Sequence, residues 1–179
     1  MRRLRRTWTI FSFLVLLVAS SGNFAARAQT SPPANASTGA ALTISGDVEK
    51  PLVLSLDDLR HMPRKTFSLK NPHDGNQETY EGVPLAELLK RAGVPRGGQM
   101  RAAASAYIVA EAKDGFRAVL SVAEADPDFA DSEILVADTF NGAALGENDG
   151  PLRLVLPHEH KASRSVRMLH SLTVVSVSK

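Results

Sequence analysis

Short apolar runs alternate with polar turn residues through most of the chain. Their period-two alternation and β-branched content predict strands. These strands are expected at residues 42–44, 52–54, 66–69, 107–112, 116–120, 134–140, 152–156 and 171–177. The pairs Asp114-Gly115 and Asn141-Gly142 are typical of tight turns between strands. The polar stretch 70–79 is predicted to be an exposed loop, because it contains proline and glycine but little apolar surface.

Helix signals are few and short. The best-defined helix begins at Pro84, whose ring suits a first turn, and stops at Gly93, which supplies a left-handed residue. Its apolar face consists of Leu85, Leu88 and Leu89. Shorter helices are expected after Ser55, ending near Leu59, and after Ser121, because both serines suit the N-cap. Hairpins interrupted by short helices, without regular strand–helix alternation, favour an α+β fold.

The N-terminus has the three parts of a secretory signal peptide: a basic head, an apolar run over 10–19 and the small-residue site Ala26-Arg27-Ala28. That run is shorter than the roughly 20 residues of a spanning helix. We therefore expect residues 1–28 to be removed on export, which places the protein in the periplasm or outside the cell without stable membrane insertion. Residues 29–40 are expected to form a flexible leader, and 41–179 one folded domain. The pair Arg5-Arg6 leaves the twin-arginine route open beside general secretion.

Cysteine is absent from the whole sequence. Its absence excludes disulfides, thiolate metal sites, iron–sulfur clusters and cysteine nucleophiles. Five of the 21 basic residues lie within 1–28, which leaves 16 against 19 acidic residues, a net charge of −3. This balance gives no reason to expect nucleic acid or an acidic membrane as partner. The sequence contains neither a Gly-x-Ser-x-Gly elbow nor a glycine-rich phosphate loop.

Three segments are informative when they are taken in order. They are 80–89 (YEGVPLAELL) with 92–94 (AGV), then 114–119 (DGFRAV), and then 141–142 (NG) followed by 150–157 (GPLRLVLP) and 162–167 (ASRSVR). Together they resemble the oxidoreductase molybdopterin-binding domain family, which has the sulfite oxidase fold and includes small exported bacterial members. The resemblance covers nearly all of the chain beyond the signal peptide. It implies a sulfite-oxidase-like molybdopterin-binding fold, with mixed and antiparallel β-sheets and short helices.

The resemblance also implies a cofactor site. In that family the Gly-Pro-Leu-Arg strand and the turn after it help to hold the anionic pterin cofactor, molybdopterin. The matched positions in this sequence are Arg153, Arg164, Ser165 and Arg167. Guanidinium and hydroxyl donors suit a terminal phosphate in a partly dry pocket. The alternative is that these arginines are solvated and paired with nearby acids.

The chain departs from the family at the metal. Catalytic members ligate molybdenum through a cysteine on the segment before the Gly-Val-Pro-Leu helix, and here that segment, 67–74, reads FSLKNPHD. Sulfur ligation would then come from the cofactor alone, or be supplemented by a harder ligand such as Ser68, His73 or Asp74. The other alternative, which we favour, is that no metal is bound, because a direct metal ligand is hard to replace.

His158 and His160 flank Glu159 and form a second candidate. Two histidines at this spacing on an extended segment point to the same side. A zinc or copper site needs further ligands, which the sequence does not indicate. A solvent-facing loop, or donors to a bound ligand, are the alternatives for this pair.

Three functions remain open at this stage. The first is an oxidoreductase-type domain that still binds molybdopterin. The second is a non-catalytic periplasmic module that binds a small anionic ligand or docks onto a redox partner in the periplasm or the membrane. The third is an adaptor without a pocket, which predicts that Arg153, Arg164 and Arg167 lie on unrelated faces.

Overall fold

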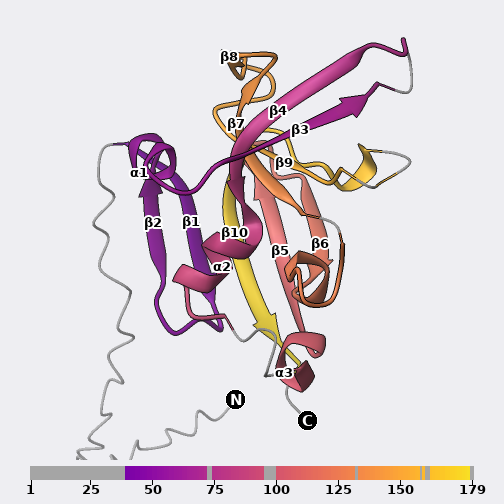
Figure 1. Ribbon diagram of the computed structural model, residues 1–179. Coiled ribbons are helices and arrows are strands. Elements are labelled where there is room, and N and C mark those ends of the chain that lie inside the picture. Colours follow the sequence, from indigo (N-terminus) through magenta and orange to yellow (C-terminus); the bar gives the residue numbers. More distant parts are fainter. Residues whose placement is uncertain are drawn as a thin grey trace, which may run out of the picture. The chain divides into compact units, whose positions relative to one another are not determined.

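Two five-stranded β-sheets form the framework of the computed structural model (Figure 1). The chain divides into the units Met1–Ala34 and Asn35–Lys179. The structure describes residues 39–71, 74–94, 100–131, 133–157, 159 and 162–177, all within the second unit. The predicted signal peptide and most of the predicted leader lie outside the described residues.

The first sheet is mixed. Strand β1 pairs with β10 in parallel, and every other pair in this sheet is antiparallel. Its strands, in spatial order, are β2 (Leu52–Ser55), β1 (Ala40–Gly46), β10 (Leu169–Ser176), β5 (Ala106–Ala112) and β6 (Arg117–Ser121). The turn that joins β5 to β6 holds the predicted Asp114-Gly115 pair, where Gly115 has φ +88°, so this hairpin is confirmed.

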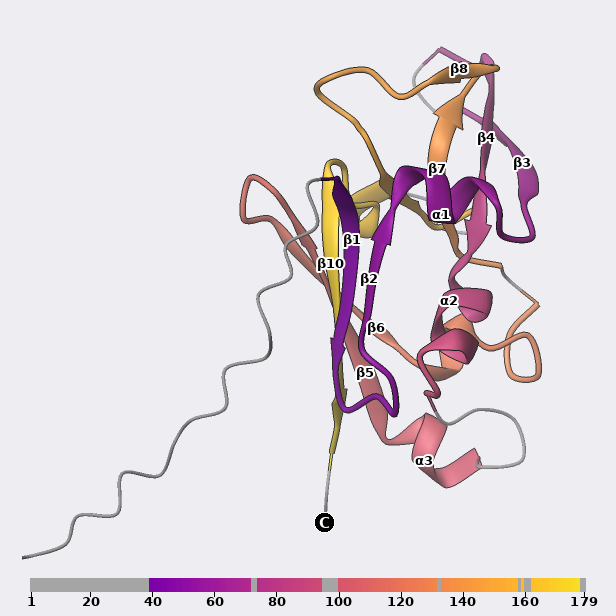
Figure 2. The same ribbon diagram turned by 90° about the vertical axis from the view of Figure 1, so that its left-hand side faces the viewer.

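The second sheet is antiparallel throughout. Its strands are β3 (Lys65–Lys70), β4 (Gln77–Pro84), β7 (Leu135–Phe140) and β8 (Ala143–Ala144), with β9 (Arg153–Val155) paired to β7. In Figure 2 the second sheet rises behind and above the first, and α2 lies beside it.

The helices within the described residues are short. They are α1 (Leu56–Arg60), α2 (Leu85–Arg91), α3 (Met100–Ala104) and the 3₁₀ turns η2 (Ala123–Ala125) and η3 (Ala162–Arg164). The predicted cap of α1 is confirmed: Ser55 Oγ accepts from the Asp58 amide at 3.1 Å, and the Asp58 carboxylate accepts from the Ser55 amide. Within the described ranges, no helix has the length and apolarity needed to cross a membrane.

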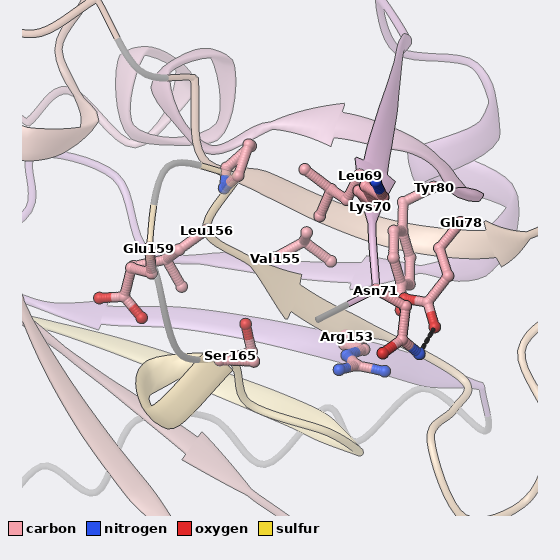
Figure 3. A pocket seen from close by; sticks show the side chains of 12 residues that line it. Leu69, Lys70, Asn71, Glu78, Tyr80, Arg153, Val155, Leu156, Glu159 and Ser165 are labelled. Atoms are coloured by element: carbon pink, nitrogen blue, oxygen red, sulfur yellow. Dashed lines mark hydrogen bonds between the residues drawn. The ribbon is translucent and has the colours of Figure 1, made fainter. Parts of the chain in front are cut away.

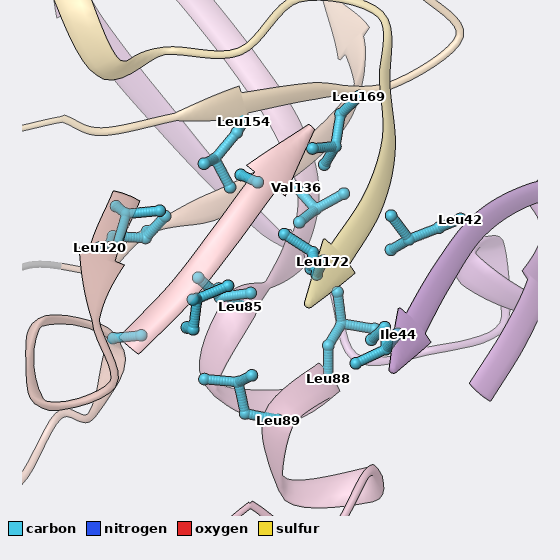
Figure 4. Close-up of a cluster of buried hydrophobic side chains, with 14 of the residues drawn as sticks. Leu42, Ile44, Leu85, Leu88, Leu89, Leu120, Val136, Leu154, Leu169 and Leu172 are labelled. Carbon is cyan, nitrogen blue, oxygen red and sulfur yellow. The ribbon is translucent and has the colours of Figure 1, made fainter. Parts of the chain in front are cut away.

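The hydrophobic core lies between the two sheets and α2 (Figure 4). It receives Ile44 and Leu172 from the first sheet, and Val136 and Leu154 from the second. Helix α2 contributes Leu85, Leu88 and Leu89, all fully buried. These are the residues that the sequence placed on the apolar face of its best-defined helix, so that prediction is confirmed.

One element was predicted wrongly. Residues 77–79, which the sequence assigned to an exposed loop, belong to β4, and the strand continues through Tyr80 to Pro84. Strand β4 pairs with β3 along one edge and with β7 along the other. These cross-strand partners are distant in sequence, and they outweigh the polar composition of the strand's first residues. The fold class is as expected, with mixed and antiparallel sheets and short helices.

Candidate functional site

Two adjacent cavities open between the second sheet and the segment around η3. The first, of about 310 Å³, lies against β3, β4 and β9, and we call it the sheet cavity. The second, of about 410 Å³, reaches the tip of the β5–β6 hairpin, and we call it the hairpin cavity. Arg153, Ala162 and Ser165 line both. The two cavities together are the cleft.

One face of the second sheet forms the floor of the sheet cavity. Leu69 of β3, Tyr80 of β4 and Val155 of β9 point to this face because side chains alternate along a strand. They pack with Leu135 and Ala137 in a small hydrophobic cluster that is distinct from the main core. The cavity therefore has an apolar floor, and polar groups stand at its rim.

The polar rim at one end of the sheet cavity consists of Asn71, Glu78 and Tyr80, facing Arg153 (Figure 3). The amide of Asn71 donates to Glu78 Oε1 at 2.7 Å, and the hydroxyl of Tyr80 donates to Glu78 Oε2 at 3.1 Å. Burial raises the pKa of Tyr80 to about 12, although the nearby Arg153 guanidinium opposes the shift. The phenol therefore stays protonated, and it remains a hydrogen-bond donor.

Arg153 occupies the wall that the two cavities share. Its guanidinium carbon lies 5.3 Å from the centre of the Tyr80 ring, within the range of a cation–π contact. Nη1 donates to Asp149 Oδ1 over a long 3.4 Å. Nε is buried, and among the described residues it has no hydrogen-bond partner. A buried guanidinium donor is normally paired, so this nitrogen can donate to an acceptor that enters the cleft.

Arg167 and Ser165 line the hairpin cavity with Arg153, Asp114 and Phe116. Arg167 is exposed, and its Nε lies 3.8 Å from Asp149 Oδ1. Asp149 thus contacts both arginines at long range. Three of the four predicted cofactor-binding residues, Arg153, Ser165 and Arg167, therefore meet at one cleft, which does not fit the reading of an adaptor without a pocket.

Arg164 lies apart from the other three. It lines neither cavity, and its Nε donates to Glu159 Oε1 at 2.5 Å. Its Nη1 donates to Glu124 Oε2 at 3.0 Å and to the Val119 carbonyl at 3.4 Å. These contacts raise the pKa of Arg164, with the Glu159 hydrogen bond as the largest cause. Arg164 ties the chain at η3 to β6 and η2, and its predicted role as a cofactor ligand is not supported by its position.

The proposed replacements for the missing cysteine have other partners. Ser68 is exposed and shares a hydrogen bond with Thr79 across the β3–β4 pair, at 3.3 Å. Asp74 accepts from the amide and side chain of Asn76 in the connecting turn. His73, His158 and His160 lie outside the described residues. Within the part of the chain that the structure describes, no group of three or more His, Cys, Asp or Glu side chains is placed to hold a metal ion.

The cleft fits the cofactor implied by the resemblance only in part. The unpaired Nε of Arg153, with Arg167 and Ser165 nearby, suits an anionic group such as a phosphate. No thiolate can be offered to a metal, because the sequence contains no cysteine. The segment that carries the cysteine in catalytic relatives instead presents Leu69, Lys70 and Asn71 to the sheet cavity.

Sequence reasoning missed several residues of the cleft. Asn71 and Glu78 fall in the stretch that the sequence predicts to be a loop, and Tyr80 enters only as part of a family segment. Asp149 lines neither cavity but contacts Arg153 and Arg167, and the sequence pattern does not indicate it. Thr79, Tyr80 and Val83 are residue types enriched in strands and were a signal for β4, but the polar residues before Tyr80 obscured it.

Comparison with known proteins agrees with this arrangement. The family model described as "Oxidoreductase molybdopterin binding domain" matches residues 30–179. Among solved structures, the chain is similar to the sulfane dehydrogenase SoxCD from Paracoccus pantotrophus, with 25% identity and a TM-score of 0.60. That alignment covers 77% of this chain but 39% of the other, so this chain spans well under half of the dehydrogenase chain. None of the curated proteins matches. The chain belongs to the oxidoreductase molybdopterin-binding domain family.

Proposed function

We propose that this domain binds molybdopterin or another phosphate-bearing anion in the cleft, through Arg153, Ser165 and Arg167. The observation that carries the proposal is the buried Nε of Arg153, which has no partner within the described ranges although it lies on the wall common to both cavities. A phosphate offers several acceptor oxygens, and guanidinium groups bind it through paired hydrogen bonds.

The proposal does not include catalysis at a protein-ligated metal. Molybdopterin brings its own dithiolene sulfurs, but this chain adds no thiolate to them. Its own residues bind and orient the anionic group, and the apolar floor at Leu69 and Val155 excludes water from one side of the ligand. The activity and partners of sulfane dehydrogenase are therefore not assigned to this chain. Docking onto a periplasmic or membrane redox partner is the alternative function.

Thermal unfolding with added phosphate, pyrophosphate or sulfate tests the proposal, with ionic strength held constant. A ligand at about 100 times its dissociation constant stabilises the folded state by roughly 2.7 kcal/mol, which raises the melting temperature by several degrees. We expect this shift for wild-type protein, and we expect Arg153→Ala to abolish most of it. Arg91→Ala is the matched control, because Arg91 is an exposed residue of α2 paired with Glu87. If no anion shifts wild-type protein, or if Arg153→Ala retains the full shift, the proposal is wrong.

Export is part of the same proposal and rests on the N-terminal pattern. Fractionation of cells that express the full chain is expected to find the protein outside the cytoplasm, with an N-terminus near Gln29. Recovery of uncleaved protein from the cytoplasm would contradict export.

A further inference from the structure

The described residues that line the cleft include carboxylates as well as cations, although a purely anionic ligand would favour a surplus of positive charge. Among these residues there are three cationic side chains and three carboxylates. The cations are Lys70, Arg153 and Arg167, and the carboxylates are Glu78, Asp114 and Glu159. Such a lining suits a ligand that carries hydrogen-bond donors as well as an anionic group.

Of the three carboxylates, Glu78 is the one that neutral side chains hold at both oxygens. Asp114 accepts from the Phe116 amide at the exposed hairpin tip. Glu159 is paired with Arg164. Glu78 is half-buried and accepts from a side-chain amide and a phenol, but it forms no ion pair within the described segments.

The environment of Glu78 holds its carboxylate in place and leaves it acceptor capacity. Asn71 binds one oxygen and Tyr80 the other. Each carboxylate oxygen has two lone-pair sites, so one site on each oxygen remains beyond these bonds. Arg153 lies on the same side of the cavity, close to the Tyr80 ring (Figure 3). The Glu78 carboxylate and the Arg153 guanidinium thus lie near each other beside the apolar floor of the cavity. Such a combination suits a flat ring with polar groups along its edge.

We propose, on the basis of the function proposed above, that Glu78 accepts the N–H edge of a heterocyclic ligand while Arg153 binds its anionic group. The ligand class is an amino-substituted heterocycle that carries a carboxylate or a phosphate. A 2-amino-4-oxopyrimidine edge presents two parallel N–H donors, which match the two oxygens of a carboxylate. When the amino group is replaced by oxygen, an acceptor faces the carboxylate and one hydrogen bond is lost.

Calorimetric titration with two closely matched compounds tests this inference. Pterin-6-carboxylate has the 2-amino group, and lumazine-6-carboxylate has oxygen in its place. We expect wild-type protein to bind the pterin about tenfold or more tightly than the lumazine. Glu78→Gln should remove this preference, because its amide presents a donor to the ligand's donors. Glu111→Gln, on the first sheet and paired with Arg117, should retain it.

The failures can be told apart by titrating inorganic phosphate in parallel. One outcome is that wild-type protein binds the two compounds with equal affinity, while it still binds phosphate and Arg153→Ala does not. That result overturns this inference and leaves the proposed function standing. A preference that persists in Glu78→Gln also overturns it. Absence of binding by phosphate and by both compounds overturns the proposed function as well. If Glu78→Gln fails to fold, Glu78→Asp is the second variant. Its side chain is shorter by one methylene, so the carboxylate lies farther from the ligand and the preference for the pterin should fall. A preference equal to that of wild-type protein contradicts the inference.

Discussion

Replacement of Asp138 by asparagine tests the buried ion pair that connects the chain before β3 to strand β7. Arg64 Nη1 donates to Asp138 Oδ2 at 3.0 Å and Nη2 to Oδ1 at 2.7 Å, so the pair is bidentate. The Asp138 side chain is 8% exposed and that of Arg64 is 22% exposed. Arg64 Nε also donates to Glu81, at 2.8 Å. Asp138→Asn keeps the shape of the side chain but removes its charge.

The expected cost follows from this geometry. Removal of one partner from a buried ion pair typically destabilises a protein by about 3–5 kcal/mol. Arg64 keeps Glu81, whose side chain is 42% exposed and therefore better solvated. We accordingly expect Asp138→Asn to lower the free energy of unfolding by about 2–3 kcal/mol at pH 7. The exposed pair of Glu87 and Arg91 provides the control, and Glu87→Gln should cost about 0.5 kcal/mol or less.

The loss should depend on pH. Burial opposes ionisation of Asp138, but hydrogen bonds from Arg64 and Thr139 outweigh it and hold the pKa of Asp138 below its ordinary value. A lowered pKa in the folded state stabilises the protein above the unfolded-state pKa, about 3.9, and this stability is lost as pH falls through the folded-state pKa. Urea unfolding of both proteins from pH 7 to pH 3 measures the difference. We expect it to be constant near neutrality and to shrink below about pH 4. A difference under about 0.5 kcal/mol at pH 7, or one that does not change with pH, would refute the reasoning.

Three further substitutions test the packing and the cleft. Gly82→Ala should destabilise the domain by about 2–3 kcal/mol in urea unfolding, because an added Cβ would lie 2.1 Å from the Val136 carbonyl oxygen. Unchanged stability would show that β4 and β7 do not approach so closely. Ser55→Ala should cost about 1 kcal/mol, since it removes the α1 cap, and Ser55→Thr should restore most of it. Arg164→Ala should change phosphate affinity by about threefold or less, because Arg164 already forms ion pairs with Glu124 and Glu159. Arg153→Ala should lose much more affinity, and an equal loss in the two variants would place Arg164 in the site.

Local signals were enough to predict much of the fold. Ser55 caps α1, Asp114-Gly115 turns the β5–β6 hairpin and the leucines of α2 enter the core, because each feature depends on residues near one another in sequence. Strand β4 was missed because its stability comes from pairing with β3 and β7 and not from its own composition. The pattern of hairpins and short helices favoured an α+β fold, and the ordered set of family segments specified which α+β fold it is.

The candidate site was predicted less completely, for a related reason. Arg153, Ser165 and Arg167 converge as expected. Arg164 belongs to the same turn, but its direction is set by Glu124, far away in sequence, and by Glu159. Glu78 could not be chosen among the acidic residues from sequence, because its role depends on its place in β4 and on the neutral partners that surround it.

The central claim, that the cleft binds an anionic cofactor through Arg153, is tested most directly by native mass spectrometry. Wild-type protein and Arg153→Ala would be purified from a host that makes molybdopterin and compared at intact mass. We predict a phosphate-bearing ligand on the wild-type protein and its loss from the variant. Wild-type protein at the mass of the bare polypeptide, or the same adduct on both proteins, would contradict the account.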